Sequence, residues 1–387
     1  MLESIKCSTS GAYYLRGQWV PDDAQAPAAL AAAGVTAEQA GQAYKGTMAY
    51  GILTAHNTSG NDRDLRIKFD AMASHDITFV GIIQTARASG LEKFPIPYVL
   101  TNCHNSLCAV GGTINEDDHM FALSAAHKYG GIYVPTNMAV IHSYNREMMS
   151  GCGRMILGSD SHTPTGGGIG MLAMGAGGLD VAVAMGGGAY YITMPKVVKI
   201  NLTGKLNDWV SAKDVILEVL RQLSVKGGVG KVMEYTGEGV KSLSVPERAT
   251  ITNMGAELGA TTSIFPSDET TLQFLKAQGR EEDYIPMSAD PDAVYDEEVN
   301  IDLSKLVPLA ACPHSPDNVK TVEEIGKIKI DQVCIGSCTN SSLQDMRKVA
   351  HILKGKTVHP DVSLAIAPGS KQVFNQIAED GTLSILI

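Results

Sequence analysis

The sequence predicts an α/β protein. Three short apolar segments, 96–103, 130–135 and 154–160, indicate buried strands, and residues 117–129 between the first two indicate a helix. Alternation of strands and helices is typical of sheets covered by helices. The chain has 387 residues, of which 44% are apolar, enough for a large core and more than one domain.

The remaining elements follow from spacing and capping residues. Residues 65–77 are predicted as a helix because Leu65, Phe69 and Met72 recur at helical spacing. The segment 196–204 is predicted as an edge strand that closes a domain. A helix at 211–224 begins at Ser211, and another follows Asp268 and ends at Gly279. The acidic stretch 280–300 is predicted as a surface loop.

The last part of the sequence repeats the same alternation. Strands are expected at 331–337 and 362–368, and helices at 341–354 and 370–380. The final residues, "LSILI", are expected to be a strand that is cut short. We therefore expect a fragment of a longer protein, truncated within its third domain.

Composition excludes several classes of function. The net charge is −10 and no basic run occurs, so nucleic acid is not an expected partner. No apolar stretch of 18 residues and no signal or transit sequence is visible, so we expect a cytoplasmic protein without a membrane span. Seven cysteines, an odd number in a long chain, favour a reducing compartment over a disulfide framework.

The stretch "LGSDSHTPTGGGIG" (157–170) is the strongest local indication of a site. Asp160, Ser161 and His162 follow a predicted buried strand, where open α/β sheets place ligands. The carboxylate and the imidazole could form an acid–base pair, or the histidine could serve only a tight loop. We expect the glycines 166–168 to let the backbone approach a ligand and expose amides to an anion.

Other candidates are weaker on their own. His104 in "NCHNSLC" also follows a strand, and a zinc site built from Cys103, His104 and Cys108 is a possible alternative. His142 taken alone is more typical of a core histidine. Glu257 lies in a small-residue, apolar context, where a buried carboxylate needs a partner or a raised pKa.

Two cysteines in "CIGSCTNSS" (334–342) lack the spacing of a redox CxxC pair. Cys334 lies in the predicted strand and is expected to be buried. Cys338 lies in the polar turn that follows it, where a cysteine is either simply exposed or a cluster ligand.

Taken in order, these motifs resemble the aconitase superfamily, the iron–sulfur hydro-lyases. The resemblance covers residues 50–387 and includes "GIIQTA", "NCH", "IHSY", "GSDSHTPTGGGIG", "ITNMGAELGATTSIFP", "GSCTNSS" and "APGSK". The nearest resemblance is to a bacterial group of aconitase-like putative hydratases that share "TNCHNSLCAVGG". It implies three-layer α/β/α domains at 1–199 (with a variable segment 1–45) and 200–306, and a partial domain at 307–387.

The resemblance also implies a function and a set of site residues. The activity would be a hydro-lyase reaction on a small hydroxy-di- or tricarboxylic acid, with a [4Fe–4S] cluster in the complete protein. Gln84 and Ser161 would contact substrate, Asn253 would lie beside the cluster, and Cys338 would be a cluster ligand. The implied catalytic residues are His104, His142, Asp160, His162 and Glu257.

Two departures from the family pattern shape the expectations. Cys103 occupies the place of the family's aspartate beside His104, and a thiol is a weak hydrogen-bond partner. A paralogue that has lost catalysis and serves as a binding or iron-responsive protein is therefore the alternative function. In addition, two cluster cysteines and the C-terminal domain of the family are expected to lie beyond this sequence or on another chain.

We therefore predict that the 387-residue chain alone is inactive and holds no stable cluster, because one thiolate cannot replace three. Anaerobic reconstitution followed by absorbance spectroscopy and an aconitase-type assay checks this. Full cluster absorbance together with turnover would show the expectation to be wrong.

Overall fold

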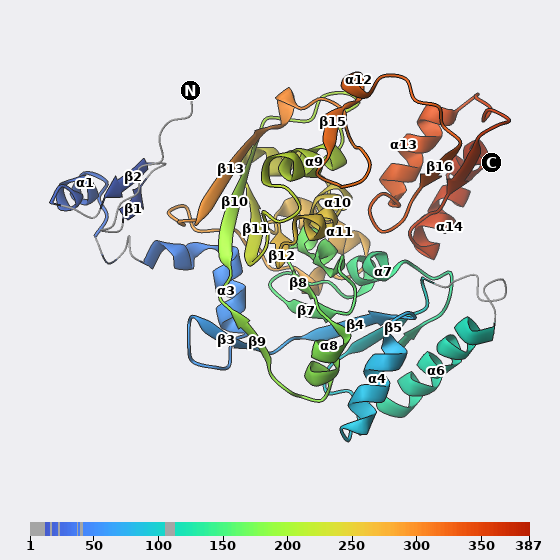
Figure 1. Ribbon diagram of the computed structural model, residues 1–387, viewed down its shortest axis with the longest axis horizontal. Helices are drawn as coiled ribbons and strands as arrows, with labels where there is room; N and C mark the ends of the chain where they lie inside the picture. The colour runs from blue at the N-terminus through green and yellow to red at the C-terminus, as the bar shows by residue number, and fades with distance from the viewer. Residues whose placement is uncertain (1–11, 16–17, 22–23, 37, 39–41, 105–112) are drawn as a thin grey trace.

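The computed structural model describes residues 12–15, 18–21, 24–36, 38, 42–104 and 113–387. It is a mixed α/β structure in which helices flank two parallel sheets, as Figure 1 shows. This confirms the predicted α/β class. No helix within the described ranges is long and apolar enough to cross a membrane.

The first sheet has five parallel strands in the order β6-β5-β4-β7-β8. The predicted strands at 96–103, 130–135 and 154–160 are confirmed as β5, β6 and β7, and the helix at 117–129 belongs to α6. The bounds in this part of the chain are β4 Ala71–His75, α4 Phe79–Ala88, β5 Tyr98–Thr101, α6 Thr113–Tyr129, β6 Ile132–Val134, α7 Ile141–Met148, β7 Met155–Gly158, β8 Leu172–Gly175 and α8 Gly178–Met185.

The second sheet has four parallel strands in the order β12-β11-β10-β13. Its helix α9 begins after Ser211, whose side chain forms a capping box with Asp214, and α11 begins after Asp268, as predicted. The bounds are β10 Lys196–Thr203, α9 Ala212–Leu223, β11 Lys231–Thr236, α10 Val245–Met254, β12 Thr262–Ile264, α11 Glu269–Ala277 and β13 Glu297–Asp302. The surface loop predicted at 280–300 is thus too long, because its last residues, from Glu297 on, belong to β13.

In the C-terminal unit, the parallel strands β16 and β17 pair with each other and are accompanied by the helices α13, α14 and α15. Its apolar core contains Met346, Val373 and Ile377. The bounds are β16 Gln332–Ile335, α13 Leu343–Leu353, β17 Ser363–Ile366, α14 Lys371–Glu379 and α15 Thr382–Leu386. The first four elements confirm the predicted alternation.

Smaller elements connect these units. Two-stranded antiparallel pairs join β1 to β2, β3 to β9 and β14 to β15. Figure 1 shows β1, β2 and α1 to one side of the two large sheets. The bounds are β1 Ala12–Leu15, β2 Gln18–Pro21, α1 Ala26–Ala32, α3 Met48–Ala55, β3 Asp64–Ile67, β9 Tyr190–Thr193, β14 Leu309–Ala311, β15 Val319–Thr321 and α12 Val322–Ile325.

The glycine-rich segment forms a buried 3-10 turn, Thr163–Ile169, that packs the two sheets together. A Cβ on Gly167 would overlap the carbonyl of Ser263, and one on Gly168 would overlap the backbone of Ala249 in α10. The amide of Phe265 donates to the carbonyl of Gly167 at 2.9 Å. The expectation that these glycines open the backbone to an anionic ligand is therefore wrong, because they admit the protein's own backbone.

The predicted helix at 65–77 is wrong. The segment forms β3 and β4, and β3 alternates exposed and buried residues while β4 is buried throughout. The spacing of Leu65, Phe69 and Met72 fits a helix by coincidence. Short apolar runs do not distinguish a buried strand from a helix, and pairing with β5 and β7 decided the outcome.

Two further expectations about strands are corrected. The segment 196–204 is not an edge strand, because β10 lies between β11 and β13, where Lys199 reaches Glu298 on the neighbouring strand. The final "LSILI" is not a strand. It belongs to α15, whose Leu383 and Leu386 pack on the core of the C-terminal unit. The division into domains at 199 and 306 stays a prediction.

The close packing of Gly167 gives a test of this architecture. Gly167→Ala should destabilise the fold by about 1–3 kcal/mol or more, because the added methyl group meets backbone that cannot rotate away. The matched control is Gly51→Ala in α3, where a Cβ meets nothing within 4 Å. That change should stabilise the chain by about 0.5–1 kcal/mol. Urea unfolding of both variants is the measurement, and equal effects would contradict the packing argument.

Candidate active site

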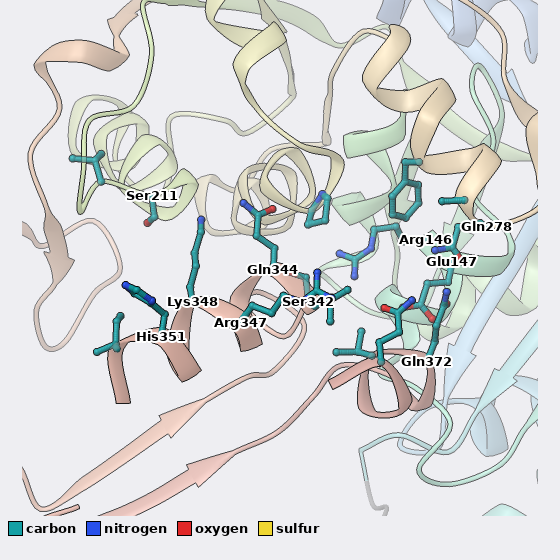
Figure 2. A pocket seen from close by; sticks show the side chains of 18 of the residues that line it. Arg146, Glu147, Ser211, Gln278, Ser342, Gln344, Arg347, Lys348, His351 and Gln372 are labelled. Atoms are coloured by element: carbon teal, nitrogen blue, oxygen red, sulfur yellow. The ribbon is translucent and has the colours of Figure 1, made fainter. Parts of the chain in front are cut away.

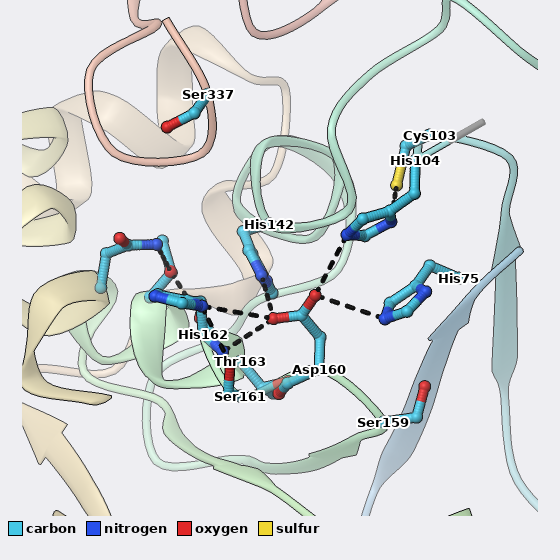
Figure 3. A network of polar contacts seen from close by, with 12 residues as sticks. His75, Cys103, His104, His142, Ser159, Asp160, Ser161, His162, Thr163 and Ser337 are labelled. Atoms are coloured by element: carbon cyan, nitrogen blue, oxygen red, sulfur yellow. Dashed lines mark hydrogen bonds and ion pairs between the residues drawn. The ribbon is translucent and has the colours of Figure 1, made fainter. Parts of the chain in front are cut away.

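Three neighbouring parallel strands end at one edge of the first sheet, and polar side chains follow each of them. His75 ends β4 and Asp76 follows it, His104 follows β5, and Asp160 follows β7. Because β4 lies between β5 and β7, these side chains converge at the carboxyl end of the sheet. Figure 3 shows the resulting network.

The carboxylate of Asp160 is the centre of the network. It lies 3.0 Å from Nε2 of His142, 3.4 Å from Nε2 of His75 and 3.5 Å from Nε2 of His104. The backbone amide of His162 donates to it at 2.7 Å. Burial would raise the pKa of Asp160, but hydrogen bonds from the imidazoles of His104, His142 and His162 hold it far below its usual range, so the group stays ionised.

A second carboxylate supports His104 from its other side. Asp76 is fully buried, accepts the backbone amide of His104 at 3.0 Å, and lies 3.6 Å from its Nδ1 and 3.3 Å from Nε2 of His119. The Sγ of Cys103 lies 3.3 Å from the same Nδ1. The expectation that Cys103 leaves His104 without a carboxylate is therefore corrected, because Asp76 supplies one.

The histidines differ in charge. Asp160 first, then Asp76 and Cys103, raise the pKa of His104 to about 12, so its imidazole is a cation at neutral pH. Burial and the neighbouring charge of His104 lower the pKa of His75 to about 4, so that ring is neutral. Burial also lowers the pKa of His142. The positively charged imidazole of His104 and the neutral imidazoles of His75 and His142 thus lie around the Asp160 anion.

His162 connects the network to the second sheet. Its Nδ1 lies 3.0 Å from Oγ of Ser161, and its Nε2 lies 3.2 Å from Oε1 of Glu257, in the 3-10 turn Gly255–Leu258 after α10. Asp160 is the largest cause of the raised pKa of His162, and Glu257 adds to it. The side chain of Glu257 is 38% exposed, so the expectation of a buried carboxylate is wrong.

A chain of hydrogen bonds ties the loop of Cys338 to the same place. Thr339 Oγ1 donates to Asn253 Oδ1 at 2.9 Å, and Asn253 Nδ2 donates to Thr165 Oγ1 at 2.8 Å. Thr165 Oγ1 in turn donates to the carbonyl of His162 at 2.6 Å. Cys338 is partly exposed in this loop. Figure 3 shows its neighbour Ser337 facing the histidines.

One expected site residue, Gln84, is not brought to the network, and the expectations for two cysteines also need comment. Gln84 is exposed in α4, and among the described residues it has no hydrogen bond with any member of the site. Cys334 is exposed in β16, not buried, because it lies on the uncovered face of a two-stranded sheet. Cys108 lies outside the described residues. The only three-residue metal-ligating group found in the described ranges is His75, Asp76 and His104. The alternative zinc set of Cys103, His104 and Cys108 includes a residue outside those ranges, so it stays a prediction.

Sequence reasoning missed His75, Asp76 and His119. The first two lie at the end of β4, the strand that was predicted as a helix. Had that segment been recognised as a strand, an adjacent histidine and aspartate at its carboxyl end would have matched the pattern of Asp160 and His162. His119 gave no signal, since a histidine in a helix is unremarkable until its partner is known.

The arrangement suits proton transfer beside an anionic ligand. His104 is 34% exposed and cationic, so it offers both a proton and a positive charge to a bound molecule. Asp160 and Asp76 fix its ring from two sides. His162, whose Nδ1 lies 3.7 Å from Asp160, and Glu257 form a second imidazole–carboxylate pair in the same network.

A family model matches most of the chain. The model described as the aconitase family (aconitate hydratase) matches residues 50–387. The chain belongs to the aconitase family. Members of this family use a [4Fe–4S] cluster.

Curated relatives in the aconitase family fall into two groups. The 3-isopropylmalate dehydratase large subunit of Clostridium kluyveri is 44% identical over 236 residues, which cover 61% of this chain and 56% of that protein. The mitochondrial aconitate hydratase of Saccharomyces cerevisiae is 36% identical over 371 residues, which cover 87% of this chain and 48% of that protein. The chain thus spans about half the length of these aconitase-family relatives.

The charge of His104 gives a direct test of the network. Asp160→Asn removes the largest stabilisation of the imidazolium, so the pKa of His104 should fall from about 12 and its ring should titrate at lower pH. An NMR titration of the imidazole signals measures this. Asp70→Asn is the matched control, because Asp70 pairs with His56 at 2.9 Å outside the network. An unchanged pKa of His104 would contradict the assigned geometry.

Proposed function

We propose that the complete protein is a hydro-lyase that adds or removes water on a small hydroxy-di- or tricarboxylic acid. The single observation that carries this proposal is the Asp160 carboxylate surrounded by the imidazoles of His75, His104 and His142. Dehydration needs a proton for the departing hydroxyl group, and this network holds one on an exposed ring.

His104 is the proposed proton donor. Loss of a hydroxyl group is slow unless its oxygen is protonated as it leaves, and an imidazolium within reach performs that step. The anion of Asp160 and the buried Asp76 keep the ring protonated and oriented between turnovers. In the hydration direction, the imidazole of His104 takes a proton from the water molecule that adds to the substrate.

The remaining site residues bind and orient. Ser161 and His162 present a hydroxyl and an imidazole at the rim of the site, with Glu257 holding the imidazole. The positive charge of His104 favours a carboxylate substrate locally, although the chain as a whole carries a charge of −10. His142 is buried and holds Asp160 in place.

The family cofactor fits one position of this chain. Cys338 is partly exposed in the loop that Thr339 ties to Asn253, so its thiolate would bind one iron of a [4Fe–4S] cluster beside Asn253. When bound, the cluster supplies a Lewis acid for the substrate oxygen atoms. Its other ligands, and the base that removes the carbon-bound proton, would come from outside the described residues.

The names of the relatives support the proposed class of substrate and the proposed partner. Relatives named as 3-isopropylmalate dehydratase large subunits favour a partner that supplies further domains, and relatives named as aconitate hydratases favour the same domains within one chain. The proposed substrate is therefore a hydroxy acid with two or three carboxylates.

The test uses the full-length protein with its complete cluster. His104→Gln should lower the turnover number by about 10²–10⁴-fold, because the proton donor is lost, with a smaller effect on KM. His127→Gln, the same change on the exposed face of α6, is the control and should leave turnover unchanged. Dehydration of a panel of hydroxy-carboxylates, followed by ultraviolet absorbance of the product, is the measurement.

Two results would overturn the proposal. An intact cluster with no turnover on any hydroxy-carboxylate would favour the alternative of a binding or iron-responsive paralogue. Full activity in His104→Gln would leave hydro-lyase activity in place but remove His104 as the proton donor.

A further inference from the structure

A second pocket lies away from the histidine network, where α7, α10 and α11 face α13 and α14. Its volume is about 870 Å³. Figure 2 shows side chains from both sides pointing into it. Much of its wall is apolar, formed by Val210, Pro246, Phe274, Leu343, Ile352 and Val373.

Arg146 of α7 lines this pocket and is unusual among the buried arginines. Its side chain is 6% exposed, and its Nε has no hydrogen-bond partner. No carboxylate oxygen among the described residues lies within 4.0 Å of its guanidinium. A buried guanidinium without a hydrogen-bond acceptor is costly, because its hydration is lost. Burial lowers the pKa of Arg146, and the nearby carboxylates of Glu147 and Asp345 oppose this without contacting the group.

The two other arginines that are buried within the described ranges show what this fold normally provides. Arg248 donates to Asp268 through two nitrogens at 2.9 and 2.7 Å and also reaches backbone carbonyls. Arg280 donates to Asp283 and to the carbonyls of Arg146 and Ser150. Each is saturated by acceptors within the chain. The lack of acceptors at Arg146 is therefore specific to the pocket.

The other charged groups around the pocket are already paired. Glu147 accepts from Ser370 at 2.8 Å, and burial raises its pKa. Arg347 pairs with Asp380 at 2.6 Å, and Lys348 with Glu247 at 3.3 Å. Figure 2 shows the guanidinium of Arg146 directed across the pocket toward the start of α13 at Ser342.

We propose that this pocket is a second binding site, which takes an organic carboxylate with an apolar body. The planar fork of a guanidinium matches the two oxygens of a carboxylate, and the apolar walls accept a hydrocarbon chain. The site is independent of the proposed hydro-lyase reaction, since none of its lining residues belongs to the histidine network.

Trp209 provides the readout. It lines the mouth of the pocket and is 81% exposed, and the chain contains only one other tryptophan, Trp19. In a Trp19→Phe background of the 387-residue chain, the fluorescence of Trp209 reports on the pocket alone. The probes are butanoate, hexanoate and octanoate, with octanol and inorganic phosphate as comparisons.

We expect the fluorescence to change saturably with the carboxylates, most tightly with octanoate, and octanol and phosphate to bind more weakly. Arg146→Met should weaken octanoate binding roughly tenfold to hundredfold, since a charge-assisted hydrogen-bond pair is lost. The same variant should unfold at the same or a higher temperature, because it removes an unpaired buried charge.

A second pair of variants tests the site without changing a buried residue. Gln376→Glu places a negative charge on the exposed wall of the pocket and should weaken octanoate binding. Gln332→Glu makes the same charge change on exposed β16, outside the pocket, and should have no effect.

Four results would overturn the proposal. They are no saturable binding of any carboxylate, equal binding of octanol, tighter binding of phosphate than of octanoate, and unchanged octanoate binding in Arg146→Met and Gln376→Glu. A lowered unfolding temperature in Arg146→Met would indicate a structural role for the arginine instead.

Discussion

The interaction between the Asp160 carboxylate and its ring of imidazoles is the constraint on which the site depends. A carboxylate in a largely buried position is unfavourable unless several donors replace its hydration. His75, His104 and His142 reach it from the end of β4, the end of β5 and the start of α7. Each of these elements must hold its position for the anion to persist, so the geometry of the first sheet and the charge of the site are coupled.

Packing between the two sheets fixes the other half of the site. The buried glycine turn after His162 lets α10 and β12 approach closely, and this approach brings Glu257 within reach of His162. Asn253 in α10 then connects the turn to the loop of Cys338 through Thr165 and Thr339. The glycines 166–168 that follow His162 therefore serve the packing of the two sheets. The position of His162 beside Glu257 follows from that packing.

In the part of the chain that the structure describes, most buried charged groups have hydrogen-bond partners, and Arg146 is the exception. Asp76, Arg248 and Arg280 each have partners that satisfy them, and Glu234 accepts two amides of α3 and the hydroxyl of Tyr295. Arg146 departs from this rule within a large apolar pocket. Natural folds rarely keep such a group without a use, because a neutral residue of similar volume would be more stable.

The sequence by itself determined the α/β class and most of the strands and helices, and it indicated Asp160, His162 and His104 as candidate site residues. Motif chemistry and strand-end placement are local properties, so they can be recognised from the sequence. Only the tertiary structure decided that 71–75 is the central strand, because its apolar run is compatible with helix or strand until β5 and β7 pair with it. That pairing brings His75 and Asp76 to the site, gives His104 a carboxylate that its own motif lacks, and leaves Gln84 outside. Pairing partners, burial and the charge states that depend on them are set by contacts between residues far apart in the chain.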